Sequence, residues 1–217
     1  MGQIILASAS PRRKELLEQI GLSFEICPAK GEEVITKEAP QEVVVELASQ
    51  KAREVAAMVK TYQENHTDLV TPQDTLIIGA DTVVACPDDE MPDCKKSTIL
   101  GKPKDEEDAF SMLSVLSGRT HSVYTGVSIV FLDVSGKAGE YTFYEKTDVT
   151  MRQMDAEEIK RYIDTGEPMD KAGAYGIQGK CAIYIDKIHG DYNNVVGLPV
   201  AAIYRELKKL GIDIYRW

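Results

Sequence analysis

The sequence lacks the features that mark a membrane or exported protein. No apolar run comes near the roughly 20 residues that a membrane-spanning helix needs, so we expect no membrane partner. The first apolar stretch, in MGQIILASASPRR, is short and has no basic residue before it, which disfavours a secretory signal. No repeat, low-complexity tract or linker interrupts the chain. These absences predict one domain over residues 1–217 in a cytoplasmic protein.

Cysteine, histidine and net positive charge are also scarce. The four cysteines form no CxxC motif and are not spaced with the three histidines as zinc ligands are, so we expect reduced thiols and no zinc. The 25 lysines and arginines are outnumbered by 35 acidic residues, which gives a formal net charge of −10. This charge disfavours a nucleic-acid partner, because such proteins normally carry a basic surface. It still allows a small anion held by a few local cations.

The common nucleotide and hydrolase motifs are missing as well. The chain has no GxGxxG after a strand, no GxxxxGK[ST] phosphate loop and no GxSxG elbow. What it has is EPMDKAGAYGIQG, residues 167–179, with glycines at positions 173, 176 and 179. This spacing indicates a loop whose backbone can approach a ligand closely. A plain flexible loop is the alternative, although such loops are poorer in Ala, Tyr and Ile.

The hydrophobic pattern predicts a mixed α/β fold with an antiparallel hairpin. The hairpin joins residues 121–133 to 139–151 through DVSGKAG, and Asp155 with Glu158 has the spacing of a capping box. Ser10 and Asp105 are the other expected helix caps, and residues 87–97 are expected to be an exposed connection. The remaining predicted strands are 3–7, 23–28, 75–86 and 180–188. Helices are predicted from Pro11 to about residue 20, over 40–65, over 106–117, from Asp155 to near Gly166, and from Pro199 to Leu210.

Several charged residues lie where the pattern predicts burial. Asp81 interrupts the apolar strand LIIGADTVVAC, where a lone carboxylate costs several kcal/mol unless it is paired or bound to a metal. Lys51 follows Leu47 by four residues on the apolar face of the long helix. Arg12 and Arg13 occupy a first helical turn, where the helix dipole disfavours cations. The alternatives to a functional role are that Asp81 caps a turn and that Lys51 extends its ammonium group to solvent.

Weaker signals come from residues at the ends of other elements. Lys102 precedes a proline in ILGKPKD, Glu33 follows a flexible AKG, and Ser8 lies between a strand and a helix. Lys171 lies within the glycine-rich stretch. Taken singly, these residues are typical of a solvated surface. If the fold brings them together with Asp81, they suit metal-assisted attack of water on a phosphate.

The motifs LASASPRR, GADTVV, GKP, HSVYTGV, EPMDKAGAYGIQG and GDYNNVVGLPV, with Glu33 and Lys51, together resemble the Maf family of nucleoside triphosphate pyrophosphatases. The resemblance covers nearly the whole chain in the same order. It implies a mixed twisted sheet with flanking helices and two lobes around a central cleft, related to the inosine-triphosphate pyrophosphatases. It also implies hydrolysis of a nucleoside triphosphate to the monophosphate and pyrophosphate with a divalent metal, Mg²⁺ or Mn²⁺, and it leads us to expect a homodimer.

The resemblance also assigns expected roles to individual positions. Asp81 of GADT matches the proton acceptor, and Glu33 would share the metal with it. Arg12, Thr82 and Gln178 match the positions of the branch that acts on dTTP and UTP. Other matched site residues are Ser8, Arg13, Lys51 and Lys102, and we extend a binding role to Lys171 and Asp191 from their motifs.

The predicted function is therefore hydrolysis of dTTP and UTP, with CTP and modified pyrimidine nucleotides as further candidates. The alternative is a non-catalytic nucleotide-binding regulator of cell division.

Overall fold

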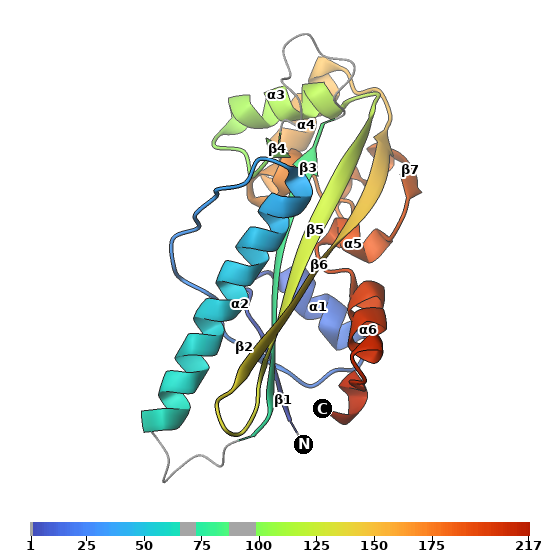
Figure 1. The fold of residues 1–217 in the computed structure, drawn as a ribbon. Coiled ribbons are helices and arrows are strands. Elements are labelled where there is room, and N and C mark those ends of the chain that lie inside the picture. Colours follow the sequence, from blue (N-terminus) through green and yellow to red (C-terminus); the bar gives the residue numbers. More distant parts are fainter. Residues whose placement is uncertain (1, 66–72, 87–98) are drawn as a thin grey trace.

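The computed structural model describes residues 2–65, 73–86 and 99–217 (Figure 1). The strands are β1 (Gln3–Leu6), β2 (Glu25–Ile26), β3 (Thr75–Ala85), β4 (Ile99–Leu100), β5 (Thr120–Leu132), β6 (Ala138–Met151) and β7 (Ile185–His189). The helices are α1 (Pro11–Gln19), α2 (Pro40–Asn65), α3 (Glu106–Leu116), α4 (Ala156–Ile163), α5 (Tyr192–Val196) and α6 (Val200–Lys209). These described ranges also contain four 3-10 helices: η1 (Glu167–Asp170), η2 (Ala172–Ala174), η3 (Lys180–Tyr184) and η4 (Ile214–Arg216).

All the described strands belong to one mixed sheet. Its order is β2-β1-β3-β5-β6-β7, and β4 pairs with β3 outside this path. The first three strands of the order are parallel, whereas β5, β6 and β7 pair antiparallel with their neighbours. The mixed α/β fold and the β5–β6 hairpin predicted from the sequence are therefore confirmed.

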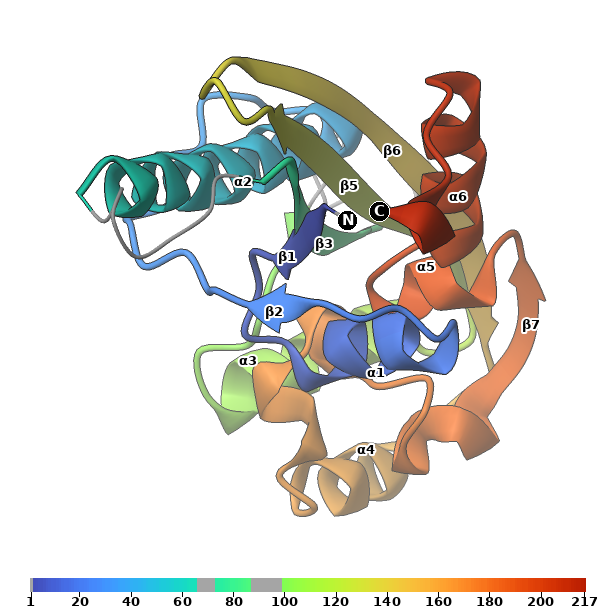
Figure 2. The same ribbon diagram turned by 90° about the horizontal axis from the view of Figure 1, so that it is seen from below.

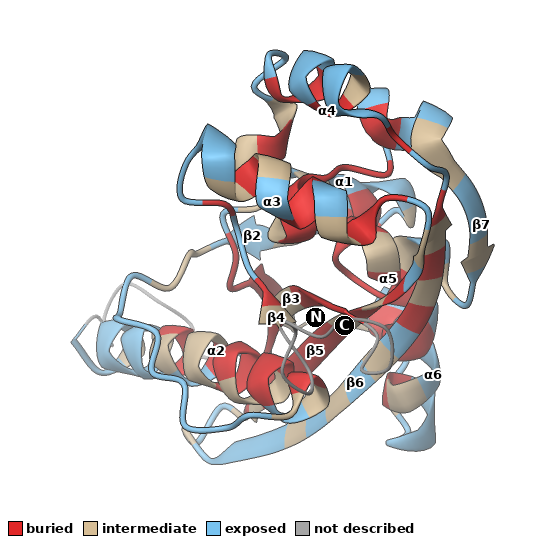
Figure 3. Ribbon diagram, turned by 90° about the horizontal axis from the view of Figure 1, so that it is seen from above, coloured by how far each residue is buried: buried red, intermediate tan, exposed pale blue. Residues whose placement is uncertain are grey.

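Alternation along the strands divides the core between the two faces of the sheet. In β1, Ile4 and Leu6 belong to the larger cluster, while Ile5 packs in a smaller cluster with Ala52 and Val55 of α2. Helix α2 therefore covers one face, and α1, α5 and α6 lie on the other (Figures 1 and 2). The burial pattern agrees, because α2 is buried on the side toward β3 and β5 and exposed on the other (Figure 3).

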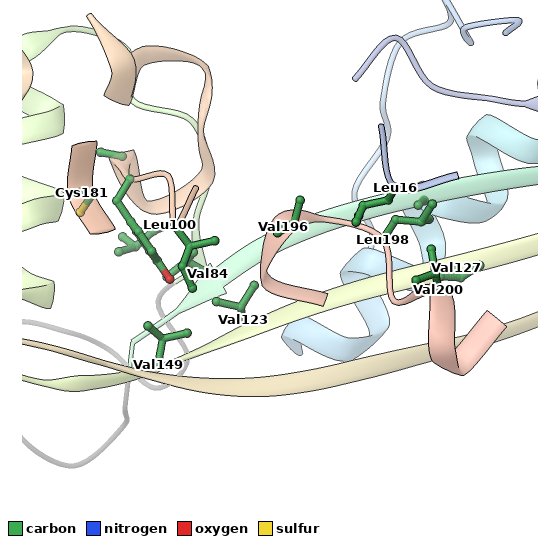
Figure 4. Close-up of a cluster of buried hydrophobic side chains, with 14 of the residues drawn as sticks. Leu16, Val84, Leu100, Val123, Val127, Val149, Cys181, Val196, Leu198 and Val200 are labelled. Carbon is green, nitrogen blue, oxygen red and sulfur yellow. The ribbon is translucent and has the colours of Figure 1, made fainter. Parts of the chain in front are cut away.

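The larger cluster ties the sheet to the segments around the glycine-rich stretch. Val84, Val123 and Val149 come from three adjacent strands and lie near Cys181 of η3 (Figure 4). Leu198 is fully buried in the same cluster, close to Leu16 of α1 (Figure 4). This packing fixes the C-terminal third of the chain against β3.

Two glycines let α2 approach the sheet closely. A Cβ added at Gly79 would lie 2.5 Å from the carbonyl oxygen of Ala48, and one at Gly126 would lie 2.3 Å from the backbone of Val44. Any side chain at either position would push α2 away from the sheet. The close approach matters for Asp81, which follows Gly79 by two residues on the same face and pairs in register with Gly126.

One local prediction was wrong, and another holds in part. Residues 180–184 form η3 instead of a strand, because the amide of Lys180 is bonded to the Glu167 carboxylate and that of Ala182 to the Gly179 carbonyl. Ser10 occupies the N-cap position of α1 with Pro11 at N1, as predicted, but its side chain makes no capping hydrogen bond, and its amide donates to Ser8 Oγ at 3.2 Å.

The other predictions hold in part. The strand expected over 23–28 is limited to β2, and α5 was missed within HGDYNNVVGLPV. The predicted caps at Asp105 and Asp155 are confirmed, the second as a full capping box. The connection expected over 87–97 lies outside the described residues. Across the described ranges, no helix is both long and apolar enough to cross a membrane.

Candidate active site

A cavity of about 870 Å³ opens beside the middle of β3. Strand β1 pairs with β3 as far as Ile78, and β4 pairs with it from Val84 onward. Between these two points that edge of β3 is not paired with a described strand. Side chains from both faces of β3 therefore reach the same space, Asp81 from the α2 side and Thr82 from the α1 side.

All ten site residues expected from the sequence line this cavity. They come from six separate parts of the chain: Ser8, Arg12, Arg13, Glu33, Lys51, Asp81, Thr82, Lys102, Lys171 and Gln178. Asp191 is not among the lining residues, and its carboxylate instead accepts a hydrogen bond from the Asn193 amide at the start of α5. The fold thus brings together the charged residues that the pattern marked as out of place.

The lining is basic although the chain is acidic. The cationic lining residues are Arg12, Arg13, Lys37, Lys51, Lys102 and Lys171, and the acidic ones are Glu33, Asp81 and Asp170. Six positive charges against three negative ones give a local excess of three, in a chain whose formal net charge is −10. Such a reversal concentrates a polyanion in the cavity and disfavours binding elsewhere on the surface.

Lys51 lies between two carboxylates. Its Nζ is 2.5 Å from Asp81 Oδ1 and 2.9 Å from Glu33 Oε1. The Lys51 and Asp81 side chains are only 18% and 14% exposed, whereas that of Glu33 is 51% exposed. No donor in the described parts of the chain is hydrogen-bonded to the second Asp81 oxygen, Oδ2. This oxygen is the one available to an incoming molecule.

Arg13 is held by three acceptors at the start of α1. Its Nε donates to the Gly197 carbonyl at 2.8 Å, and its two Nη atoms donate to Ser8 Oγ and Thr82 Oγ1, each at 3.1 Å. Desolvation lowers the pKa of Arg13, while Asp81 opposes this shift. An arginine stays charged under these conditions. Arg13 is therefore a fixed positive charge whose orientation is set by the backbone and by hydroxyl groups.

A chain of hydroxyl groups extends from Arg13 into the core. Thr82 Oγ1 lies 2.9 Å from Thr125 Oγ1, and Thr125 donates to the Asn194 carbonyl at 3.0 Å. Because the Thr125 proton is used on Asn194, Thr82 is the donor to Thr125 and the acceptor from Arg13. The Thr82 hydroxyl thus positions Arg13 as well as lining the cavity.

Arg12 and Lys171 share one carboxylate on the opposite side of the cavity. Asp170 accepts from Arg12 Nη1 at 3.1 Å and from Lys171 Nζ at 2.6 Å. Desolvation raises the pKa of Asp170, but hydrogen bonds from Lys171 and Arg12 outweigh it and leave the pKa lowered. Lys102 and Gln178 line the cavity with exposed side chains, whose contacts would come from a ligand.

The loop carrying Lys171 and Gln178 is organised by Glu167, which sequence reasoning missed. The Glu167 carboxylate accepts from Tyr162 Oη at 2.9 Å and from the Lys180 amide at 2.9 Å. Tyr162 Oη in turn accepts from the Gly176 amide at 3.1 Å. A Cβ at Gly179 would lie 2.1 Å from Glu167 Oε1, so this glycine is needed where the loop closes on the carboxylate. Its place as the first residue of the stretch EPMDKAGAYGIQG was the available signal.

Burial sets the protonation state of the groups behind this loop. Desolvation raises the pKa of the Cys181 thiol to about 12 and also raises that of Tyr162. Tyr175 lines the cavity, and its Oη is hydrogen-bonded to His121 Nε2 at 2.8 Å. Desolvation lowers the pKa of His121 to about 4, with Asp148 opposing the shift. These groups are neutral at pH 7.

Glu33 and Asp81 fit a divalent cation. Their carboxylates converge on one point, since both are within ion-pair distance of the same Lys51 ammonium group. Two carboxylate oxygens completed by waters and phosphate oxygens form the donor set that Mg²⁺ commonly takes. In the described ranges, no group of three or more His, Cys, Asp or Glu side chains could hold a metal on its own. The donors present therefore suit a metal that arrives with a phosphate ligand.

Comparison with known proteins gives a consistent result. The family described as Maf-like protein matches residues 3–210. A dTTP/UTP pyrophosphatase from Agathobacter rectalis is 67% identical over 214 residues, covering 99% of this chain and 100% of the relative. Relatives with the same name from Lachnoclostridium phytofermentans and Bacillus cereus are each 46% identical; the alignments cover 100% and 99% of this chain and 99% and 98% of the relatives.

Among solved structures, a nucleoside-triphosphatase described as a dITP/XTP pyrophosphatase from Mycobacterium abscessus has a TM-score of 0.34 and 15% sequence identity. The match covers 70% of this chain and 75% of that one.

Proposed function

The chain belongs to the Maf-like protein family, and from that premise we propose that it hydrolyses dTTP and UTP to the monophosphate and pyrophosphate. The observation that carries the proposal is the basic cavity in an acidic chain, with Asp81 placed between its cations. The full-length similarity to relatives named dTTP/UTP pyrophosphatase supports the same substrates. The family match over residues 3–210 also supports our expectation of a single domain.

Asp81 is the proposed general base. Its Oδ2 would take a proton from a water molecule as the water oxygen attacks the α-phosphorus. The bond between that phosphorus and the oxygen bridging to the β-phosphate breaks, and pyrophosphate leaves with the electron pair. Lys51 holds the carboxylate through Oδ1, which keeps Oδ2 directed at the cavity. The reaction consumes one water and one nucleoside triphosphate.

The cations would stabilise charge on the phosphate chain. Arg13 is fixed by Ser8, Thr82 and Gly197, so it needs no reorganisation when a phosphate arrives. Arg12 and Lys171 would exchange Asp170 for phosphate oxygens. A divalent metal held by Glu33 and Asp81 would supply additional positive charge at the phosphate oxygens when it is bound.

Gln178 is the proposed contact to the base. Its amide offers two donor hydrogens and one acceptor, which match the edge of thymine or uracil. It is exposed on the cavity wall between Gly176, whose amide donates to Tyr162 Oη, and Gly179, which packs closely against the Glu167 carboxylate. A side chain on a fixed backbone can select between bases of different hydrogen-bonding pattern.

Pyrophosphate release from a panel of triphosphates with Mg²⁺ or Mn²⁺ tests this proposal. We expect turnover of dTTP and UTP, with CTP and modified pyrimidine nucleotides as the informative further substrates. Asp81→Asn should lower kcat by about 100-fold or more, the usual contribution of a positioned base. Asp164→Asn, at an exposed position after α4, is the matched control and should keep full activity.

Two results would contradict the proposal. Near-normal turnover by Asp81→Asn would remove Asp81 from its role. Triphosphate binding by the wild-type chain without pyrophosphate release would favour the non-catalytic regulator instead. Light scattering on the same preparation measures whether the chain forms the expected homodimer.

A further inference from the structure

The segment between β2 and α2 forms one wall of the cavity although residues 27–39 are neither helix nor strand. Glu33, Ile35 and Lys37 line the cavity, whereas the residues between them do not. This alternation is that of an extended chain, in which successive side chains point to opposite sides. Segment 30–37 therefore presents one regular face to the cavity, and something other than a sheet must hold it in that register.

Three side chains of α2 hold it. Glu46 accepts from the Thr36 amide at 2.9 Å and from the Thr36 hydroxyl at 2.5 Å. Gln50 accepts from the Val34 amide at 3.0 Å and donates to the Val34 carbonyl at 2.6 Å. Glu54 accepts from the amides of Lys30 and Gly31, at 2.7 Å and 3.0 Å. The row Glu46, Gln50 and Glu54 is called the α2 rack below.

The geometry of the α2 rack matches an extended chain. Residues four apart on a helix share a face and are separated by about 6 Å along its axis. Two residues of an extended chain span nearly the same distance, about 6.6 Å. Glu46 and Gln50 therefore bind alternate amides, those of Thr36 and Val34, and the side chains between them are directed into the cavity. Gln50 bonds both backbone groups of Val34, as a neighbouring strand would.

Glu33 is the residue whose position depends on this arrangement. It lies between Gly31 and Val34, which are bound by Glu54 and Gln50. Its side chain is 51% exposed, so packing does little to hold it. Its contact with Lys51 at 2.9 Å is what brings it toward Asp81. With the backbone on both sides fixed, the carboxylate loses less conformational freedom when it binds a cation.

We propose that Glu46, Gln50 and Glu54 are positioning residues that hold segment 30–37 in register, so that Glu33 meets Asp81 at the metal position. This inference rests on the proposed function for the metal-binding role of Glu33. The rack residues themselves do not line the cavity. Their effect is on the metal affinity and on the order of the segment, and the chemistry at Asp81 is left unchanged.

Gln50→Ala in the full chain is the main test. Alanine is the best helix former, so α2 is unaffected. Hydrogen exchange should show the Val34 and Thr36 amides losing protection in the variant. Mn²⁺ titration followed by electron paramagnetic resonance, with α,β-methylene-dTTP present, should show Mn²⁺ binding weakened about tenfold, the lower end of what groups behind metal ligands contribute. At saturating Mn²⁺, kcat should stay within about twofold of wild type.

Glu42→Gln is the matched control. Glu42 continues the row one turn earlier, but its side chain makes no hydrogen bond with the described segment 30–37. Glu46→Gln and Glu54→Gln remove the same charge within the rack, so they should weaken Mn²⁺ binding while Glu42→Gln does not. Gln50→Ala should also cause no further loss of Mn²⁺ affinity in a chain that already carries Glu33→Gln, since the rack acts through Glu33.

The outcomes separate this inference from the proposed function. Unchanged Mn²⁺ affinity in Gln50→Ala, or effects of Gln50→Ala and Glu33→Gln that add in full, would overturn the positioning role. Equal losses in Glu42→Gln and Glu46→Gln would do the same, because they would show a general charge effect. The wild-type chain could also bind Mn²⁺ with the analogue but release no pyrophosphate from dTTP. This result would contradict the proposed function, while the binding data would still support the positioning role of the rack.

Discussion

The two walls of the cavity are fixed by different means. Segment 30–37 is bound to α2 by hydrogen bonds that are all exposed to solvent. The opposite wall, loop 167–180, closes around Glu167 through Tyr162, whose side chain is buried, and through glycines that leave no room for a Cβ. Both walls carry residues of the proposed site, Glu33 on the first and Lys171 and Gln178 on the second.

Because of this difference, a mutation in each wall should change a different property of the protein. An exposed hydrogen bond competes with water and contributes little to folding, whereas a buried donor left without a partner costs about 1–3 kcal/mol. Damage to loop 167–180 should therefore lower the stability of the whole chain. Damage to segment 30–37 should lower ligand affinity and leave the fold intact. This division matches the proposed roles, since a metal enters and leaves while base selection needs a fixed backbone.

The sharpest comparison is between two glycine-to-alanine changes. A Cβ at Gly179 would lie within 2.4 Å of three Glu167 carboxylate atoms, which Tyr162 and the Lys180 amide hold in place. Gly179→Ala should therefore destabilise the fold by about 3 kcal/mol. Gly31→Ala meets only Glu54 Oε2 at 2.8 Å, at the end of a side chain that can rotate into solvent.

Thermal and urea unfolding of both variants measure this difference. For a chain of this length, about 3 kcal/mol lowers the Tm by roughly 6–12 °C, and Gly31→Ala should stay within about 1 °C of wild type. Equal losses in the two variants would erase the distinction between the walls. A small loss in Gly179→Ala would show that the Glu167 carboxylate is free to move aside.

Acid should destabilise the wall formed by loop 167–180 before it affects the wall formed by segment 30–37. His121 lies behind Tyr175, and burial lowers its pKa to about 4 from an ordinary value near 6.5. The unfolded chain thus binds a proton on this group at a higher pH than the folded chain does. Its contribution to stability is complete above pH 6.5 and is lost as the pH falls toward 4. The expected loss from this group is roughly 1.5 kcal/mol between pH 6.5 and pH 5.

His121→Gln keeps a hydrogen-bonding partner for Tyr175 but does not titrate. The free energy of unfolding of this variant should depend less steeply on pH between 6.5 and 5 than that of wild type. Comparing the two slopes cancels the contribution of all other titrating groups. Parallel slopes would mean that His121 is reached by water and protonated in the folded chain.

The sequence predicted the central charged residues of the site but not the contacts that hold its two walls, and the reason is physical. A carboxylate in an apolar strand and a lysine at helical spacing on an apolar face are both visible in one dimension, and the structure brings Asp81 and Lys51 to within 2.5 Å. Strand and helix periods likewise predicted β3, α2 and the β5–β6 hairpin. A side-chain to backbone contact cannot be seen in this way, because polar residues at helical spacing are typical of any exposed helix face. Glu167 and the α2 rack were therefore missed, and η3 was mistaken for a strand because its apolar residues also suit one.

The smallest effect is expected from Thr36→Val, which removes one hydroxyl from the exposed wall. The hydrogen bond from the Thr36 hydroxyl lowers the pKa of Glu46, and the Thr36 amide adds to this. The variant keeps the amide, so the pKa of Glu46 should rise only part of the way to its ordinary value, which carboxyl NMR titration measures. At neutral pH the Glu46 carboxylate stays ionised, and Mn²⁺ affinity should fall by no more than about twofold. A drop in Tm as large as that of Gly179→Ala would show that segment 30–37 unfolds together with the core, and the two walls would then be fixed in the same way.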